Sequence, residues 1–142
     1  MNFDHNFNKC TEVLNNLFGY SQYRDGQKEI IENIFNNNNT LVIMPTGAGK
    51  SICYQIPAII SDSKTVVISP LIALIDDQVS SLRQLGINIS KMHSNQSKKE
   101  NKISWDNFKN GKSKIIYISP ERLMSEYIVN SLKTLDIGLF VI

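Results

Sequence analysis

The stretch TLVIMPTGAGKSICYQIPAII, from Thr40 to Ile60, joins two apolar segments through a short polar loop. Its first five residues are apolar or β-branched and predict a buried strand. The loop PTGAGKS, from Pro45 to Ser51, holds two glycines, a lysine and a serine. The segment after it is apolar and predicts a buried helix, kinked at Pro57. A flexible, cationic loop between a strand and a helix is typical of a phosphate-binding loop, so the stretch predicts a nucleotide site.

The chemistry of the loop follows from its residue types. Gly47 and Gly49 let the backbone curl until several N–H groups face one point. Lys50 brings a positive charge to the β- and γ-phosphates, and Ser51 offers a hydroxyl to Mg²⁺. The general pattern G-x-x-x-x-G-K-[ST] has glycine where Met44 stands, a departure that the loop tolerates if the chain is extended there. The alternative, a glycine turn with a surface lysine, does not explain why strand, glycines, Lys-Ser and helix are in register.

Further strands and helices alternate along the chain. Branched apolar runs predict buried strands at residues 65–69, 114–119 and 137–142, and a weaker strand at 88–92. Helical periods between them place apolar residues on one face in three groups: Ile30, Ile31, Ile34 and Phe35; Leu71, Ile75, Val79 and Leu82; Ile128, Leu132 and Leu135. Gly86 is expected to end the second of these helices. Alternating strands and helices predict an α/β fold, a parallel sheet with helices on both faces.

Three of the predicted strands end at a proline, in VIMPTG, VVISPL and IYISPE. Pro70 and Pro120 suit the first helical position, with Ser69 and Ser119 as N-caps. The three loops then lie at the carboxyl ends of parallel strands, where ligands bind in open α/β sheets. Each Ser-Pro taken alone is better explained as a mechanical strand-to-helix turn.

Composition bounds the class of protein. The 142 residues, 42% apolar and 20% charged, are typical of one soluble globular domain. No apolar run is long enough to cross a bilayer, and the N-terminus has no signal core, so we expect an intracellular protein: nuclear if eukaryotic, cytoplasmic if prokaryotic or viral. Cys10 and Cys53 form neither a disulfide framework nor a metal-binding spacing, and Cys53 is expected in the core. The net charge of +2 is weak support for any polyanionic partner.

Four motifs together resemble one family. FGYSQYRDGQKEII, VIMPTGAGKSICYQIPA, VVISPLIALIDDQVSSL and IYISPERL, read from Leu17 to Leu123, are similar in order and spacing to the RecQ family of superfamily-two DNA helicases. The resemblance implies a RecA-like motor lobe of the P-loop NTPase class over residues 17–142, after a helical lead-in over 1–16. It also implies an ATP-driven motor that unwinds duplex DNA while moving 3′ to 5′, with roles in repair, recombination and replication.

The resemblance also implies site residues. The counterpart of Gln27 hydrogen-bonds the adenine edge, which suits a carboxamide that offers donor and acceptor side by side. Tyr20 and Arg24 match positions that stack on the base. Tyr23 and Asp25 depart from the usual Phe and Pro without touching the adenine chemistry. The predicted nucleotide-binding residues are therefore Tyr20, Arg24, Gln27, Thr46, Gly47, Ala48, Gly49, Lys50 and Ser51, with Lys50 and Ser51 also catalytic and Ser51 the ligand of Mg²⁺.

A DNA path is implied at the other motifs. The segments from Ser69 to Leu74 and from Ser119 to Leu123 match loops that meet DNA, single-stranded and duplex, and helix N-termini suit phosphate contacts. Asp76 stands where the family has a lysine, which predicts weaker DNA binding here. His93 lies in a loop similar to the family's Asn-Ser-x-Gln and is not expected to bind metal.

The sequence leaves alternatives open. In the family, Asp-Glu-Ala-His follows the strand that ends at Ile142, and those acids hold Mg²⁺ and position water. We therefore expect the 142 residues alone to be nearly inactive as an ATPase. One alternative is a non-catalytic remnant that binds nucleotide or DNA. Another is an RNA helicase of the same superfamily, although its PTREL segment differs from SPLIAL. A different phosphate-loop ATPase would not explain Tyr20, Arg24 and Gln27 together.

Overall fold

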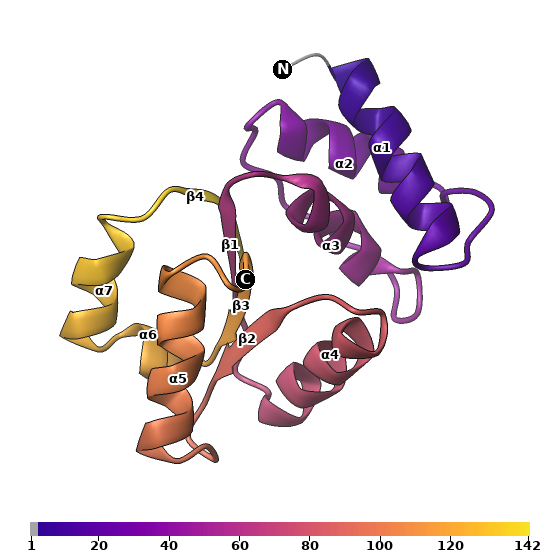
Figure 1. The fold of residues 1–142 in the computed structure, drawn as a ribbon. Helices are drawn as coiled ribbons and strands as arrows, with labels where there is room; N and C mark the ends of the chain where they lie inside the picture. Colours follow the sequence, from indigo (N-terminus) through magenta and orange to yellow (C-terminus); the bar gives the residue numbers. More distant parts are fainter. Residues whose placement is uncertain (1–2) are drawn as a thin grey trace. The chain divides into compact units, whose positions relative to one another are not determined.

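The chain divides into two compact units, Met1–Ser61 and Asp62–Ile142, in a computed structural model that describes residues 3–142. The first unit is helical, with α1 (Phe3–Asn16), α2 (Gln27–Phe35) and α3 (Lys50–Ile60) (Figure 1). Its core gathers apolar side chains from all three helices: Cys10, Leu14, Ile31, Ile52 and Ile56. The helical period over residues 30–35 is thus confirmed. Pro57 lies inside α3, as predicted.

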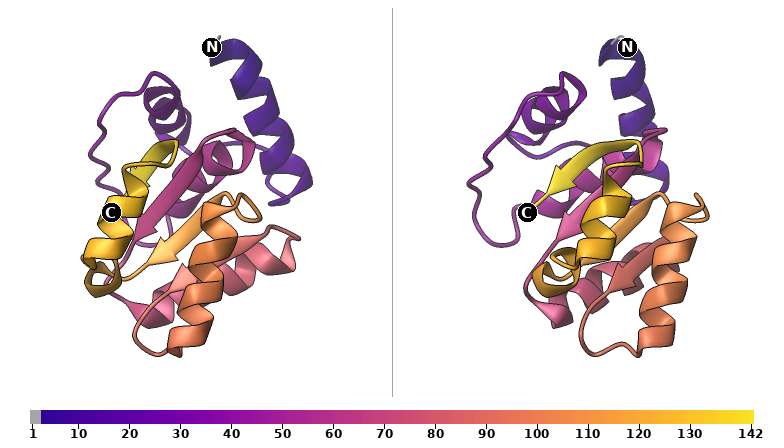
Figure 2. Two further views of the ribbon diagram at one scale, coloured as in Figure 1. Left: turned by 60° about the vertical axis from the view of Figure 1, so that its left-hand side comes forward. Right: turned by 90° about the vertical axis from the view of Figure 1, so that its left-hand side faces the viewer.

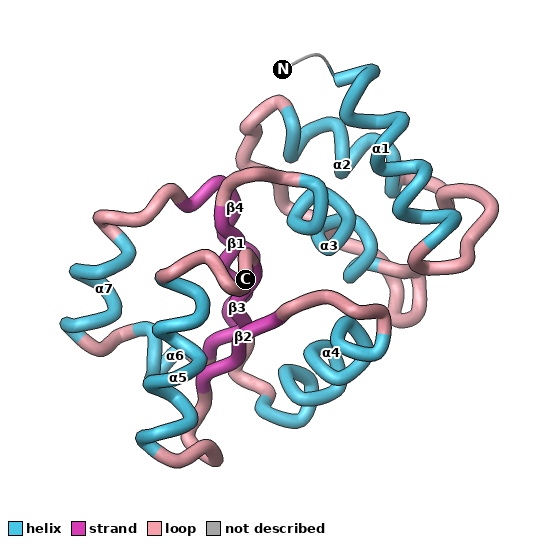
Figure 3. Tube along the Cα trace, in the orientation of Figure 1, coloured by secondary structure: helices cyan, strands magenta, loops and turns pink. Residues whose placement is uncertain are grey.

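The prediction of a buried strand at residues 40–44 is wrong. The whole connection between α2 and α3 is loop (Figure 3), and the side chains of Leu41 and Ile43 are 88% and 89% exposed. Branched residues favour an extended chain, but a strand forms only when its backbone N–H and C=O groups pair with a neighbour. Within the described residues, this segment belongs to no sheet.

The second unit is built on a four-stranded parallel sheet. In the order β2-β3-β1-β4, the strands are β2 (Ile89–Met92), β3 (Ile115–Ile118), β1 (Lys64–Ile68) and β4 (Ile137–Val141) (Figure 2). All four strands were predicted from their apolar runs. The central strand β3 is buried along its length, whereas β4 at the edge is only partly buried.

Helices cover both faces of this sheet, as predicted. One face carries α5 (Lys98–Lys109), α6 (Pro120–Leu123) and α7 (Glu126–Leu132), and the other carries α4 (Ile72–Gln84) (Figure 1). The core under α5 and α7 consists of Val66, Met92, Trp105, Phe108, Ile116, Ile118 and Ile128. On α4 the buried residues are Ile75, Val79 and Leu82, the predicted face without Leu71. The alternation of side chains along each strand supplies both faces with apolar residues.

The two Ser-Pro turns differ. Ser119 is the N-cap of α6 and Pro120 its first residue, as predicted, although the Ser119 side chain makes no capping bond. The prediction for Ser69 and Pro70 is wrong, because Leu71 is the N-cap of α4 and its side chain is exposed. The Ser69 hydroxyl accepts a hydrogen bond from the Leu71 N–H at 3.3 Å, which favours a local turn before the helix begins. Gly86 follows α4 with φ +81°, the left-handed conformation of a helix stop.

Candidate functional site

The predicted phosphate loop contains the glycine that caps α3. Gly47 and Gly49 have φ of +79° and +83°, in the left-handed region that glycine adopts without cost. Gly49 is the N-cap of α3 and Lys50 is its first residue. The curled backbone expected from the sequence is therefore present, and it leads directly into a helix N-terminus.

Arg24, which precedes α2, and Gln27, the first residue of α2, hold this loop. The Gln27 amide Nε2 donates to the carbonyls of Gly49 at 3.0 Å and Ala48 at 3.4 Å, and its Oε1 accepts from the Arg24 N–H at 2.9 Å. The Arg24 guanidinium donates to the Gly47 carbonyl. Three successive loop carbonyls are thus bound by Arg24 and Gln27, which the sequence assigned to the base rather than to the loop.

The same contacts decide where the loop N–H groups point. In a trans peptide the N–H and C=O point in opposite directions, so the N–H groups of Gly49 and Lys50 are directed away from Gln27. The first N–H groups of a helix have no partner within the helix, and the helix dipole adds partial positive charge there. This end of α3 therefore fits an anion such as a phosphate. A side chain at position 49 would disturb it, because a Cβ there would lie 2.5 Å from Gln27 Nε2.

Lys50 is held by the backbone that precedes the loop. Its Nζ donates to the carbonyl of Met44 at 2.8 Å and to that of Pro45 at 2.9 Å. Any residue offers a backbone carbonyl, so methionine in place of the glycine of the general phosphate-loop pattern leaves this contact intact. Both bonds are solvent-exposed, and water or a phosphate oxygen can replace a carbonyl at little cost. The ammonium is thus available to a bound phosphate.

Cys53 adds a support that sequence reasoning missed. It is buried one turn into α3, and its Sγ lies 3.8 Å from the Gly49 carbonyl in donor geometry. Burial raises the pKa of the Cys53 thiol, which keeps it in the protonated form that donates. Its expected place in the core is confirmed. The sequence could have predicted this contact, because residues four positions apart, such as Gly49 and Cys53, are neighbours on consecutive turns of a helix.

The remaining predicted residues of this unit lie apart from these contacts. The Tyr20 side chain is 49% exposed, and its backbone N–H donates to the Leu14 carbonyl at 3.1 Å. Ser51, in the first turn of α3, is partly buried. The structure therefore brings Arg24 and Gln27 against the loop and leaves Tyr20 on the surface.

In the second unit, three strand ends line up at one edge of the sheet. The register pairs Ile68 with Ile118 and Ile118 with Met92, so Ser69, Ser119 and His93 follow in one row. The Ser69 N–H donates to Ile118 O at 3.1 Å and the Ser119 N–H to Met92 O at 3.0 Å, which continues the sheet pairing by one residue. The two predicted DNA segments thus start on neighbouring strands, about 5 Å apart.

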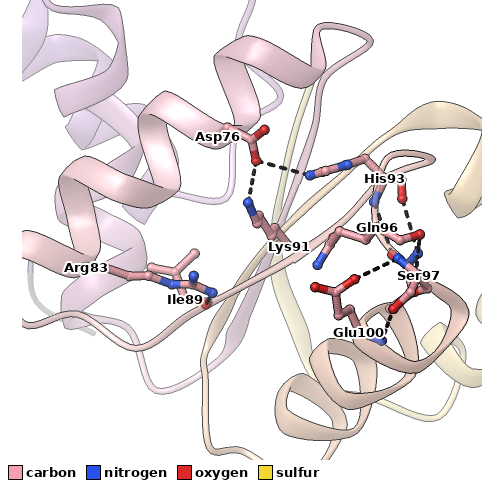
Figure 4. Close-up of polar contacts among 9 residues, drawn as sticks. Asp76, Arg83, Ile89, Lys91, His93, Gln96, Ser97 and Glu100 are labelled. Carbon is pink, nitrogen blue, oxygen red and sulfur yellow. Dashed lines mark hydrogen bonds and ion pairs between the residues drawn. The ribbon is translucent and has the colours of Figure 1, made fainter.

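A charged cluster lies beside this edge (Figure 4). Asp76 on α4 accepts at Oδ1 from the Lys91 ammonium on β2, and His93 Nε2 lies 3.1 Å from the same oxygen. The hydrogen bond from Lys91 is the main cause that lowers the pKa of the Asp76 carboxyl, with a smaller contribution from His93. The sequence marked Asp76 as a departure but gave no sign of its partners.

The loop after β2 is tied down by one buried side chain. Asn101 on α5 accepts from the His93 N–H at 3.2 Å and donates to the carbonyls of His93, Gln96 and Ser97 at 3.1, 3.2 and 3.2 Å. A capping box between Ser97 and Glu100 starts the helix (Figure 4). His93 is thus fixed on both its backbone and its ring.

The chain is similar in sequence to known proteins. The sequence model of the DEAD/DEAH box helicase family matches residues 24–142. The chain is 44% identical over 135 residues to the ATP-dependent DNA helicase RecQ of Bacillus subtilis, covering 94% of this chain and 23% of that protein. It is 43% identical over 113 residues to RecQ of Haemophilus influenzae (80% and 18%), and 42% identical over 117 residues to the ATP-dependent DNA helicase Q-like 2 of Arabidopsis thaliana (81% and 17%).

The chain therefore spans less than a quarter of the length of these curated relatives. None of the helices described over residues 3–142 has the length and apolar character that crossing a membrane requires. The resemblance to RecQ helicases read from the four motifs is confirmed. Because the family match runs from Arg24 to Ile142, the chain belongs to the DEAD/DEAH box helicase family.

Proposed function

We propose that this chain is the ATP-binding part of a RecQ-like DNA helicase, which unwinds duplex DNA 3′ to 5′ with energy from ATP hydrolysis. The observation that supports this most is the phosphate loop. Its N–H groups at Gly49 and Lys50 point away from the Gln27 contacts that hold its carbonyls. The relatives are named ATP-dependent DNA helicases, which favours DNA over RNA as the polymer.

The nucleotide would be held from two sides. The loop from Thr46 to Ser51 takes the phosphates, with Lys50 placed to neutralise their charge. Mg²⁺ is usually held by few protein ligands together with substrate phosphates, so it would bind through the Ser51 hydroxyl and the phosphates. When bound, Mg²⁺ supplies charge neutralisation for phosphoryl transfer.

The base would lie against the start of α2, with Tyr20 and Arg24 stacking and Gln27 on the adenine edge. Gln27 already uses its Oε1 and Nε2 in bonds to Arg24 and the loop. To recognise adenine, Gln27 must therefore give up some of its hydrogen bonds to Arg24 and the loop and form hydrogen bonds to the base instead. The exchange would link base recognition to the position of the phosphate loop.

DNA would run along the carboxyl edge of the sheet, over the segments from Ser69 to Leu74 and from Ser119 to Leu123. Their backbones are joined through β3, since the Ser69 N–H donates to Ile118 O. Leu71 and Leu74 are exposed at 61% and 45%, which leaves apolar surface for bases beside the polar loops.

The test is DNA-stimulated ATP hydrolysis and strand separation by the full-length protein. We expect single-stranded DNA to stimulate hydrolysis, and duplexes with a 3′ overhang to be unwound while those with a 5′ overhang are not. Lys50→Ala should weaken ATP binding by about ten- to a hundredfold, the value of a hydrogen bond to a charged group, and abolish unwinding. Lys9→Ala, which removes an exposed lysine of α1, is the matched control and should leave both unchanged.

Three results would overturn the proposal in different ways. Stimulation by RNA but not DNA would indicate an RNA helicase. Nucleotide binding without hydrolysis in the full-length protein would indicate a binding module. Equal ATP affinity in Lys50→Ala and the unaltered protein would remove the phosphate-loop assignment itself.

A further inference from the structure

One carboxylate contacts two basic side chains beside the proposed DNA path. Asp76 Oδ1 is shared by the Lys91 ammonium and the His93 ring, and all three groups lie next to the carboxyl edge of the sheet (Figure 4). The Lys91 side chain is 23% exposed and that of Asp76 is 44% exposed. Lys91 is thus within reach of solvent, but its charge is matched by a neighbouring anion.

The position of the cluster follows from the sheet register. Lys91 pairs with Tyr117, and Tyr117 pairs with Val67, so Lys91 lies in the row two residues before Ser69 and Ser119. His93 lies in the same row as those serines. Neighbouring strands are about 5 Å apart, which puts the cluster about 10 Å from the start of the segment at Ser69, within one Debye length at moderate salt.

A cation at such a place would normally favour a polyanion. Each Lys that neutralises a phosphate releases condensed counterions, which is the main source of affinity that does not depend on sequence. A carboxylate bonded to that lysine opposes the gain, because the DNA phosphate must displace it or share the cation with it. Asp76 is also fixed on α4, so it does not swing away with Lys91.

We propose that Asp76 is a positioning residue that restrains DNA binding by holding Lys91 and His93 in a neutralised cluster at the edge of the sheet. The proposal rests on the proposed DNA-binding function and adds a limit on its strength. The restraint favours release of the strand between binding events, as movement along DNA requires. The proposal also predicts that removal of the Asp76 carboxylate increases the affinity for DNA. A purely structural role for Asp76 does not predict an increase.

The experiment compares Asp76→Asn with Asp77→Asn in the full-length protein. Asparagine keeps the shape and the acceptor oxygen of Asp76 but not its charge. Asp77 is the next residue on α4 and is exposed, and within residues 3–142 its side chain makes no ion pair. The two variants change the net charge equally. Binding of a fluorescent oligo-dT is measured by anisotropy at several salt concentrations without nucleotide.

Asp76→Asn should bind the oligonucleotide more tightly than Asp77→Asn at 50 mM salt. Its plot of log K against log[salt] should be steeper by about 0.7, the slope for one added phosphate contact on a single strand. Its advantage should therefore shrink about threefold between 50 and 200 mM salt. Asp76→Glu, which restores the carboxylate, should restore the lower slope. In a Lys91→Gln background the excess over Asp77→Asn should disappear.

Several results would overturn the proposal. Equal gains in Asp76→Asn and Asp77→Asn would show a general effect of net charge, and an excess that persists in Lys91→Gln would show that Lys91 is not the released cation. Unchanged or weaker binding by Asp76→Asn would leave Asp76 with a structural role only. In these cases the unaltered protein still binds DNA and the proposed function stands. If neither the unaltered protein nor any variant binds DNA at low salt, the proposed function and this inference both fail.

Discussion

The phosphate loop and the carboxyl edge of the sheet are both candidate anion-binding regions, yet they use side chains differently. At the loop, Arg24, Gln27 and Lys50 all donate to backbone carbonyls, and among the side chains that the structure describes none of the three bonds to a carboxylate. At the edge, Asp76 and Lys91 bond to each other. The first arrangement fixes the loop backbone and leaves its N–H groups available to an anion. The second pairs two opposite charges with each other, so that neither is fully available to a ligand. A site held through its backbone should be sensitive to backbone geometry, and a site held through side chains should respond to charge.

The strongest test of the backbone support is Gly49→Ala beside Gly47→Ala. Both glycines have positive φ, which costs an L-residue about 1–2 kcal/mol. Only position 49 adds a clash, with a Cβ 2.5 Å from Gln27 Nε2, whereas nothing lies within 4 Å of a Cβ at position 47. We expect Gly49→Ala to lower ATP affinity about a hundredfold, near 3 kcal/mol, and Gly47→Ala about tenfold. Isothermal titration calorimetry with ATP measures both.

Equal losses of ATP affinity in Gly49→Ala and Gly47→Ala would contradict this prediction. Equal losses would mean that backbone strain alone decides the effect and that the Gln27 contact contributes nothing. A further check is Gln27→Ala combined with Gly49→Ala, which removes the atom that the new Cβ would meet. If the clash is real, the loss of ATP affinity in the double variant should be smaller than the product of the losses in Gly49→Ala and Gln27→Ala.

Asn101→Ala tests how far a side chain stabilises the loop after β2, at the carboxyl edge of the sheet. Asn101 is 5% exposed and bonds the backbone of the loop at His93, Gln96 and Ser97. Its loss leaves the buried His93 N–H and the Gln96 carbonyl without the Asn101 amide, whereas the His93 and Ser97 carbonyls keep bonds from the backbone N–H groups of Gln96 and Asn101. We therefore expect the free energy of unfolding to fall by about 2 kcal/mol. Asn95→Ala, at an exposed position of the same loop, should change it by less than about 0.5 kcal/mol. Urea denaturation followed by circular dichroism measures both, and equal changes would show that Asn101 is not the anchor.

The two regions also differ in how far the sequence predicted them. The phosphate loop is contiguous, so glycines, lysine and serine could be read together, and the strands around the sheet edge followed from their own branched residues. The cluster at Asp76 joins residues fifteen and seventeen positions apart, and no local pattern marks such pairs. The prediction of a strand at residues 40–44 was wrong for a related reason. A strand forms only when its backbone pairs with a neighbouring strand, and the β-propensity of a segment does not show whether such a neighbour exists. The prediction that Ser69 is an N-cap was wrong because the hydrogen bond between its hydroxyl and the Leu71 N–H competes with helix initiation at that residue.

Gln27→Ala gives the smallest expected effect and separates two roles for the same side chain. As a support of the loop, Gln27 donates to the Gly49 and Ala48 carbonyls, and its loss should weaken any nucleoside triphosphate equally. As a reader of the base, it should favour adenine, since its carboxamide matches donor and acceptor on that edge. We expect ATP affinity to fall about tenfold, roughly 1.4 kcal/mol, and GTP affinity to fall about threefold. Equal losses in fluorescence competition with the two nucleotides would restrict Gln27 to the loop. A loss for ATP alone would mean that the remaining contacts, from Arg24 and Cys53, hold the loop without it.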